Sequence, residues 1–177
     1  MSTKIYSIKH ANNILDLFNA EDKLYSSKWF MEFGKFGSEF FNEQEKIIFY
    51  VSKKFKFWKW KMVFTIKNDH GVVTELISMN AKKTIYAIDV NDITYELKIH
   101  HNKKRSVFKN GDKIAEIDES FLDTDFSDRI KLQLLEEKDL VISFLLFSCL
   151  KIGEVEQRGK TIITSQKQLE PNDEPWS

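Results

Sequence analysis

The chain has 177 residues, of which 14% are aromatic, and it contains only 6 Gly and 2 Pro. These values fit one globular domain with a bulky core and exclude collagenous and low-complexity sequences. Lys+Arg and Asp+Glu number 27 each, so the overall charge favours neither nucleic acid nor a membrane. The charge is uneven, however, because residues 1–110 hold 19 basic and 12 acidic side chains and residues 111–177 hold 8 and 15.

The N-terminal sequence MSTKIYSIKH lacks the apolar core of a secretory signal. No apolar segment reaches the roughly 20 residues that span a bilayer, so we expect no transmembrane segment. We therefore expect a cytoplasmic protein, and peripheral association with a membrane stays open.

Up to about residue 135, most of the chain alternates apolar and polar residues at the period of β-strands. We predict eleven strands: Lys4–Lys9, Ile14–Phe18, Lys23–Phe30, Lys46–Lys53, Lys61–Lys67, Val72–Met79, Thr84–Val90, Ile93–His100, Arg105–Lys109, Lys113–Ile117 and Arg129–Leu135. Turn signals lie between several of them: Asn19–Asp22, Asn68–Gly71, Asn91–Asp92 and Asn110–Asp112. Around a dozen strands would leave long edges in an open sheet, so the sequence predicts a mainly β fold, a closed antiparallel β-barrel of about twelve strands.

The segment Phe33–Phe41 (FGKFGSEFF) falls between two predicted strands, and we interpret it as a loop. Its four phenylalanines either fill the core or form an exposed patch, and the core is the expected place.

The segment Lys53–Lys61 (KKFKFWKWK) has the most distinctive local chemistry of the chain. Lysines interleaved with aromatic rings suit an anionic membrane surface or, as a weaker interpretation, single-stranded nucleic acid. The competing interpretation is a barrel hairpin, with Phe55 and Phe57 on one strand face, Trp58 and Trp60 on the other and lysines at the edge. The candidate ligand-binding residues here are Lys53, Lys54, Lys56, Trp58, Lys59, Trp60 and Lys61.

A second basic stretch, His100–Arg105, is expected in a hairpin turn. It adds Lys103, Lys104 and Arg105 to the candidate anion-binding residues, on the condition that both stretches lie on one rim of the barrel. The ordinary interpretation of such a stretch is a solvated loop.

Candidate catalytic and metal-binding groups are sparse. His100 and His101 are adjacent and would point to opposite faces of a strand, which argues against a shared metal. Asp89, Asn91 and Asp92 fit a turn better than a calcium loop, and the loop with Asp123, Asp125 and Asp128 fits a solvated surface. With no phosphate-binding loop, nucleophile elbow or paired cysteines, we expect no enzyme activity, no metal and no cofactor.

The segment Asp139–Ile152 is apolar on every helical face, which predicts a helix buried on all sides inside the barrel. Asp139 is expected to cap its start, and Lys151 and Gly153 suit its end. Cys149, the only cysteine, lies within this helix and is expected to be buried and unreactive. The predicted domain covers residues 1–153. Residues 154–177 are expected to form a polar extension, with a possible short strand at Thr161–Thr164.

This order of short strands with charged turns, as in FTIKNDHGVVTELIS and YAIDVNDITYELKI, followed by the apolar helix DLVISFLLFSCL, resembles the tubby C-terminal-like superfamily. That group includes tubby proteins, LURP-one-related proteins, phospholipid scramblases and small bacterial relatives. The resemblance implies a barrel of about twelve strands threaded by a central helix, and binding of phosphoinositide head groups by basic side chains outside the barrel. The chain lacks the cysteine-rich and membrane-anchoring segments of the scramblases, and it continues beyond the helix.

These observations lead to two functional hypotheses. In the first, the chain is a non-enzymatic module that binds anionic lipid or a phospholipid head group through the basic and aromatic segment. In the second, the barrel is a rigid protein-interaction module or scaffold, and loops such as Phe33–Phe41 or the acidic C-terminal part meet a partner.

Overall fold

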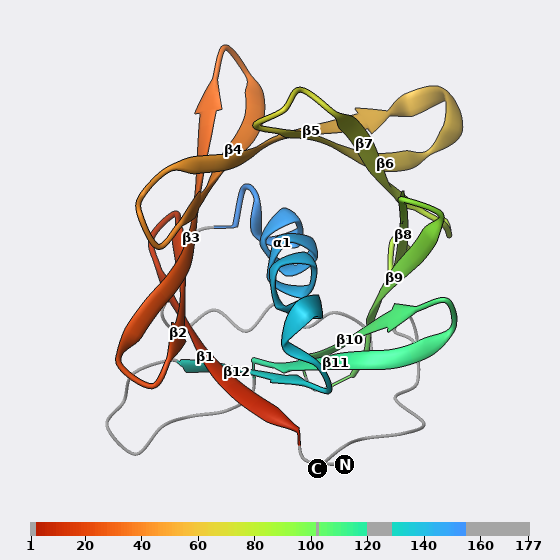
Figure 1. The fold of residues 1–177 in the computed structure, drawn as a ribbon. Coiled ribbons are helices and arrows are strands. Elements are labelled where there is room, and N and C mark those ends of the chain that lie inside the picture. Colours follow the sequence, from red (N-terminus) through yellow and green to blue (C-terminus); the bar gives the residue numbers. More distant parts are fainter. Residues whose placement is uncertain (1–2, 102, 120–128, 155–177) are drawn as a thin grey trace.

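The computed structural model describes residues 3–101, 103–119 and 129–154, and within them twelve strands close into a barrel around one α-helix (Figure 1). The strands are β1 (Lys4–Ala11), β2 (Ile14–Asn19), β3 (Asp22–Glu32), β4 (Lys35–Asn42), β5 (Ile47–Lys56), β6 (Lys61–Asn68), β7 (Val73–Ser78), β8 (Ile85–Val90), β9 (Ile93–Ile99), β10 (Lys104–Lys109), β11 (Asp112–Asp118) and β12 (Arg129–Leu134). The helix is α1 (Leu140–Lys151), and two 3₁₀ turns are η1 (Phe57–Lys59) and η2 (Glu137–Asp139). The predicted fold class is confirmed.

Each strand pairs antiparallel with its neighbours in sequence, and β1 closes the barrel by pairing with β12 from Lys4↔Leu134 to Lys9↔Arg129. The connections therefore lie alternately at the two ends of the barrel. The turns after β3, β5, β7 and β9 share one end, where α1 also finishes. The turns after β6, β8 and β10 share the other end, where α1 begins.

Alternation along the strands places one set of side chains inside the barrel. Ile8 of β1, Leu17 of β2 and Leu132 of β12 are fully buried and belong to one continuous core, which also contains Phe144 and Leu146 of α1. The ring centroids of Phe40 and Phe144 lie 5.3 Å apart, so strand and helix side chains pack directly against each other.

The strand β4 was missed by the sequence prediction, which treated its segment as a loop. Gly37 and the polar residues after it interrupt the apolar alternation, and the structure explains the glycine: a Cβ at this position would lie 2.8 Å from Cζ of Phe30. The expected burial of the four phenylalanines is wrong for one of them. Phe40 is buried and Phe36 and Phe41 are partly buried, but Phe33 is fully exposed at the turn before β4.

The start of α1 differs from the expected cap. The side chain of Asp139 makes no capping hydrogen bond; instead its Oδ1 accepts a hydrogen bond from Nζ of Lys109 at 2.9 Å. An ion pair with a strand thus replaces the local cap and anchors the start of α1 to the end of β10.

The end of α1 is held by charged side chains from the barrel wall. Lys53 Nζ donates to the carbonyl oxygen of Ile152 at 2.5 Å, and burial lowers the pKa of Lys53. Lys151 is buried and pairs with Glu119 at 3.0 Å and Glu154 at 2.9 Å. Gly153 has the expected left-handed conformation, with φ of +87°. A cation near the last carbonyls of a helix interacts favourably with the negative end of the helix dipole. These contacts therefore stabilise the C-terminal end of α1.

The helix does not fill the barrel completely. Val141 and Ile142, on the first turns of α1, are only partly buried, whereas Phe144 and Phe147 are completely enclosed. The expected burial of the helix on all sides therefore holds for most of α1 and fails at Val141, Ile142 and Leu150, which are only partly buried.

Two sequence predictions lie outside the described residues: the acidic loop with Asp123, Asp125 and Asp128, and the extension after Glu154 with its expected strand. Within the described part of the chain, no helix has the length and apolar character needed to cross a bilayer.

Candidate functional site: an exposed aromatic and basic rim

The segment Lys53–Lys61 forms the tip of the β5–β6 hairpin rather than two faces of a strand. β5 ends at Lys56, η1 follows, and Trp60 adopts a left-handed conformation with φ of 50° while its N–H bonds to the carbonyl of Phe57 at 3.2 Å. The predicted separation of phenylalanines from tryptophans on opposite faces is wrong, because this turn brings them together. The hairpin projects beyond the barrel in gold at the upper right of Figure 1.

The rings at this tip pack against one another in solvent. The centroids of Phe57 and Trp60 lie 5.5 Å apart, those of Phe55 and Trp60 lie 6.0 Å apart, and Trp58 contacts Phe57 at 6.5 Å. Trp58 is nevertheless 94% exposed, and Phe57 and Trp60 are more than half exposed. The cluster is therefore an ordered apolar surface and not part of the core.

Two further hairpins at the same end carry similar residues. The β3–β4 turn exposes Met31 and Phe33, and the β7–β8 connection exposes Met79. We call these three hairpin tips, residues 31–35, 54–61 and 78–84, the aromatic rim. Among the described residues, eleven large apolar side chains are exposed, and seven of them lie in the aromatic rim: Met31, Phe33, Phe55, Phe57, Trp58, Trp60 and Met79.

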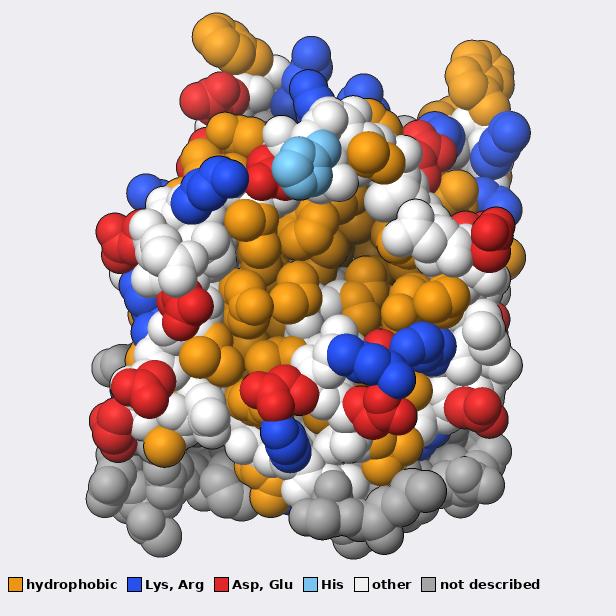
Figure 2. Space-filling view, viewed as in Figure 1, with side chains coloured by type: hydrophobic (Ala, Val, Ile, Leu, Met, Phe, Trp, Pro, Cys, Tyr) orange, Lys and Arg blue, Asp and Glu red, His pale blue; other side chains and the backbone are white. Residues whose placement is uncertain are grey.

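Lysines surround these apolar side chains. The aromatic rim contains one acidic residue, Glu32, and seven lysines: Lys35, Lys54, Lys56, Lys59, Lys61, Lys82 and Lys83. Lys83 Nζ lies 4.4 Å from the centroid of Phe55, which links the β5–β6 and β7–β8 tips. Figure 2 shows hydrophobic side chains with Lys or Arg nearby on both projections at the top of the view.

Not every predicted residue of Lys53–Lys61 belongs to this surface. Lys53 is turned toward the end of α1, as described above, and its role is structural. Lys56 forms an ion pair with Glu75 at 3.3 Å, although both side chains are about 40% exposed, so the pair is weak. Lys54 and Lys59 are exposed, and Lys61 is partly exposed.

The second basic stretch lies at the same barrel end but does not extend the rim as a free cationic patch. Lys103 is exposed in the β9–β10 turn. Lys104 lies 3.6 Å from Glu116 and 3.7 Å from Asp118, and Arg105 pairs with Glu119 at 2.6 Å. Carboxylates thus neutralise two of the three predicted cations. The condition that both stretches share one end is met, but the expected combined patch is not formed.

Of the rim residues outside Lys53–Lys61, only those in Phe33–Phe41 are singled out by the sequence, as a loop for a protein partner, and none is predicted to bind an anion. Lys82 and Lys83 lie between predicted strands without a distinctive pattern, and Met31 adjoins a predicted strand. Phe33 carries the only usable signal, because Phe33-Gly34 between two strands fits a tight hairpin turn, and the two residues have φ of 49° and 74°.

The predicted turn at Asn91–Asp92 is present, and both residues have positive φ. Asp89 Oδ1 accepts a hydrogen bond from Thr94 Oγ1 at 2.6 Å across this turn. His100 is buried. Across the described residues, no three His, Cys, Asp or Glu side chains gather closely enough to hold a metal ion.

A comparison of the chain with family models, curated proteins and solved structures finds no match. The resemblance to the tubby C-terminal-like superfamily therefore stays a prediction.

Proposed function

We propose that this barrel is a peripheral binding module that attaches to anionic membrane surfaces through the aromatic rim. The observation that carries the proposal is the concentration of exposed aromatic and thioether side chains, together with seven lysines, on three adjacent hairpins at one end. Large apolar patches on a protein surface mark interaction sites, because exposing them to water is unfavourable.

The backbone conformation at two of the hairpin tips bears on the role of the exposed rings. Phe33 and Trp60 have positive φ at hairpin tips, a region that bulky side chains rarely adopt and that glycine or asparagine would occupy without strain. Positive φ also occurs in other hairpin turns of the barrel, at Ala20, Glu45 and Lys103, so the residue type distinguishes these two tips: both present an exposed aromatic ring.

The pairing of residue types favours lipid over the other partners. Tryptophan prefers the interface between lipid head groups and hydrocarbon, and a lysine near an anionic membrane contributes about 1 kcal/mol. In protein–protein interfaces, by contrast, lysine is depleted. Nucleic acid would use the same cations and rings, but proteins that bind single strands carry them along a groove, whereas here they lie on projecting hairpin tips.

The test is co-sedimentation with vesicles of phosphatidylcholine alone or with phosphatidylserine. We expect binding to the anionic vesicles only, with affinity falling as salt rises, because exposed charges are screened. Trp58→Ala/Trp60→Ala and Lys54→Glu/Lys59→Glu should each abolish sedimentation without lowering stability. The matched control, Lys28→Glu/Lys67→Glu, reverses two exposed lysines outside the rim and should retain most of the binding.

Wild-type protein that stays in the supernatant with anionic vesicles at low salt would refute the proposal and leave a protein-interaction module in its place. Tighter binding to single-stranded oligonucleotides than to anionic vesicles would also contradict it, in favour of nucleic acid. Equal loss in the rim and control variants would show that overall charge, and not the rim, governs binding.

A further inference from the structure

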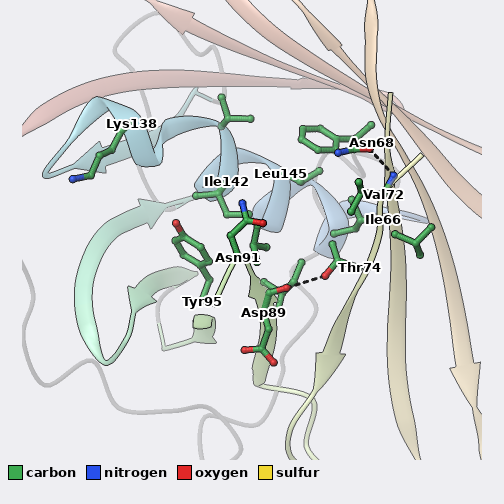
Figure 3. Close-up of a pocket in the computed structure, with 15 residues that line it drawn as sticks. Ile66, Asn68, Val72, Thr74, Asp89, Asn91, Tyr95, Lys138, Ile142 and Leu145 are labelled. Atoms are coloured by element: carbon green, nitrogen blue, oxygen red, sulfur yellow. Dashed lines mark hydrogen bonds between the residues drawn. The ribbon is translucent and has the colours of Figure 1, made fainter. Parts of the chain in front are cut away.

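At the opposite end of the barrel, an apolar cavity of about 440 Å³ lies between the first turns of α1 and the barrel wall. Five successive strands, β5 to β9, contribute side chains to it. Figure 2 looks into this end and shows hydrophobic side chains lining a hollow at the centre of the molecule. In Figure 3, Ile142 and Leu145 of α1 face Ile66 and Val72 across the space.

The cavity lies where the backbone ladder between β7 and β8 has ended. Their ladder consists of two pairs, Ile77↔Ala87 and Ser78↔Tyr86. Nearer the cavity the backbones no longer pair; instead, Thr74 Oγ1 donates a hydrogen bond to the carbonyl oxygen of Asp89 at 3.1 Å. This side-chain contact links the two strands at the wall of the cavity, beyond the end of their backbone ladder.

The mouth of the cavity is also exposed apolar surface. Val72 and Val73 are 62% and 57% exposed, and both line the cavity. Two half-buried helix residues, Val141 and Ile142, line its inner side. Protein interiors are close-packed, so an apolar space of this size is unusual, and the volume falls within the range of small-molecule sites.

Five polar residues are among those that line the cavity, Asn68, Thr74, Asp89, Asn91 and Lys138, and in Figure 3 the carboxylate of Asp89 is directed away from α1. Asn68 is fixed there because its Oδ1 accepts hydrogen bonds from the backbone N–H of His70 at 3.1 Å and Val72 at 2.8 Å. Asn91 projects from the β8–β9 turn toward the helix in Figure 3, whereas the ammonium of Lys138 points away from the apolar residues. An occupant would therefore have an apolar body and a polar end that meets amide groups.

We infer that this cavity binds a single hydrocarbon chain, the acyl chain of a fatty acid or a monoacyl lipid, with its polar head at the asparagine border. The wall from β5 to β9 extends at least about 19 Å, since paired strands lie about 4.8 Å apart and β7 and β8 are unpaired beside the cavity. A volume of about 440 Å³ spread along such a wall suits one narrow chain better than a broad ring system. This site is separate from the aromatic rim, which lies at the other ends of the same strands.

The experiment is titration with cis-parinaric acid, a fluorescent fatty acid whose polyene chain carries no ring, below its micelle concentration and without vesicles, followed by displacement with dodecanoate. We expect saturable binding with one site per chain and a rise in the polyene fluorescence. Val73→Trp should block the mouth and Ile142→Phe should fill the interior, and each should weaken binding at least tenfold. Because Val73 is exposed, its variant should fold even if the helix variant does not.

Two controls keep this site distinct from the rim. Ile5→Trp changes an apolar residue that is 58% exposed on β1 and should bind like the wild type. Lys54→Glu/Lys59→Glu should also bind the probe normally, even though it should lose vesicle binding. Absence of saturable binding, unchanged binding by both cavity variants, or loss of binding in the rim variant would each overturn the inference.

Discussion

At the residue scale, the two adjacent lysines at the start of Lys53–Lys61 have different roles. Lys53 Nζ bonds to the carbonyl of Ile152, whereas Lys54 is exposed. We predict that Lys53→Met lowers the free energy of unfolding by about 1–3 kcal/mol, because it leaves a carbonyl at the end of α1 without its donor. The matched change, Lys54→Met, should stay within about 0.5 kcal/mol of the wild type. Urea unfolding of both variants measures this difference, and equal losses would contradict the assigned role of Lys53.

Cys149 is fully buried on α1, and burial raises the pKa of its thiol well above the ordinary value. Because the thiolate is the reactive form, we predict that the native protein does not react with a thiol reagent such as DTNB at neutral pH. One thiol per chain should react once urea unfolds the protein. Rapid labelling under native conditions would show that α1 leaves the barrel readily.

Sequence patterns could not separate Lys53 from Lys54, since the role of each depends on which strand face points toward α1. Strand alternation places the two on opposite faces but does not say which face is inside. The same limit applies to Phe33 and Phe40, which are the same residue type in one segment. Phe33 lies in an exposed turn, whereas Phe40 lies on a strand and is buried. Candidate residues could therefore be identified by chemistry, while their assignment to surface or core required the register.

At the scale of elements, α1 packs against the inward-facing side chains of the barrel wall and is part of the same core. We predict that Leu146→Ala lowers the free energy of unfolding by about 2–5 kcal/mol, as expected for a fully buried leucine. Ile5→Ala on the outside of β1 should cost much less, because the residue is 58% exposed. Chemical denaturation of the two variants tests the central position of α1. Similar small losses for both would contradict it.

Eleven strands could be predicted because each alternates apolar and polar residues, and the helix because its segment is apolar on every face. β4 was missed because Gly37 and Ser38 break its apolar alternation, and the need for glycine comes from the ring of Phe30 on the neighbouring strand. The ion pair of Asp139 with Lys109 was equally hidden, since 30 residues separate the two in the chain. Long-range contacts of this kind leave no local pattern.

At the scale of the whole molecule, barrel closure followed from the number of strands and the need to cover their edges. The cavity could not be predicted, because it depends on the distance between the first turns of α1 and the wall formed by β5 to β9. The gathering of three hairpin tips into the aromatic rim was also beyond the sequence. It results from the up-and-down order, which brings alternate turns to one end.

The two ends of the molecule thus have different surfaces: exposed rings and lysines at one end, and an apolar cavity with an amide border at the other. If the aromatic rim rests on a membrane, the cavity mouth faces away from it. The proposed acyl site would then remain accessible while the protein is attached, and the two functions can be measured independently.

The most direct test of membrane attachment through the rim is tryptophan quenching by brominated lipids in anionic vesicles. With Trp176 replaced by Phe in both proteins, we expect strong quenching when Trp58 and Trp60 are present and little quenching of Trp58→Phe/Trp60→Phe, since the remaining Trp29 is partly buried and its Nε1 donates to the carbonyl of Glu154 at 3.0 Å. Quenching that is equal in the two proteins, or no quenching of wild-type protein that is bound to the vesicles, would contradict attachment through the aromatic rim.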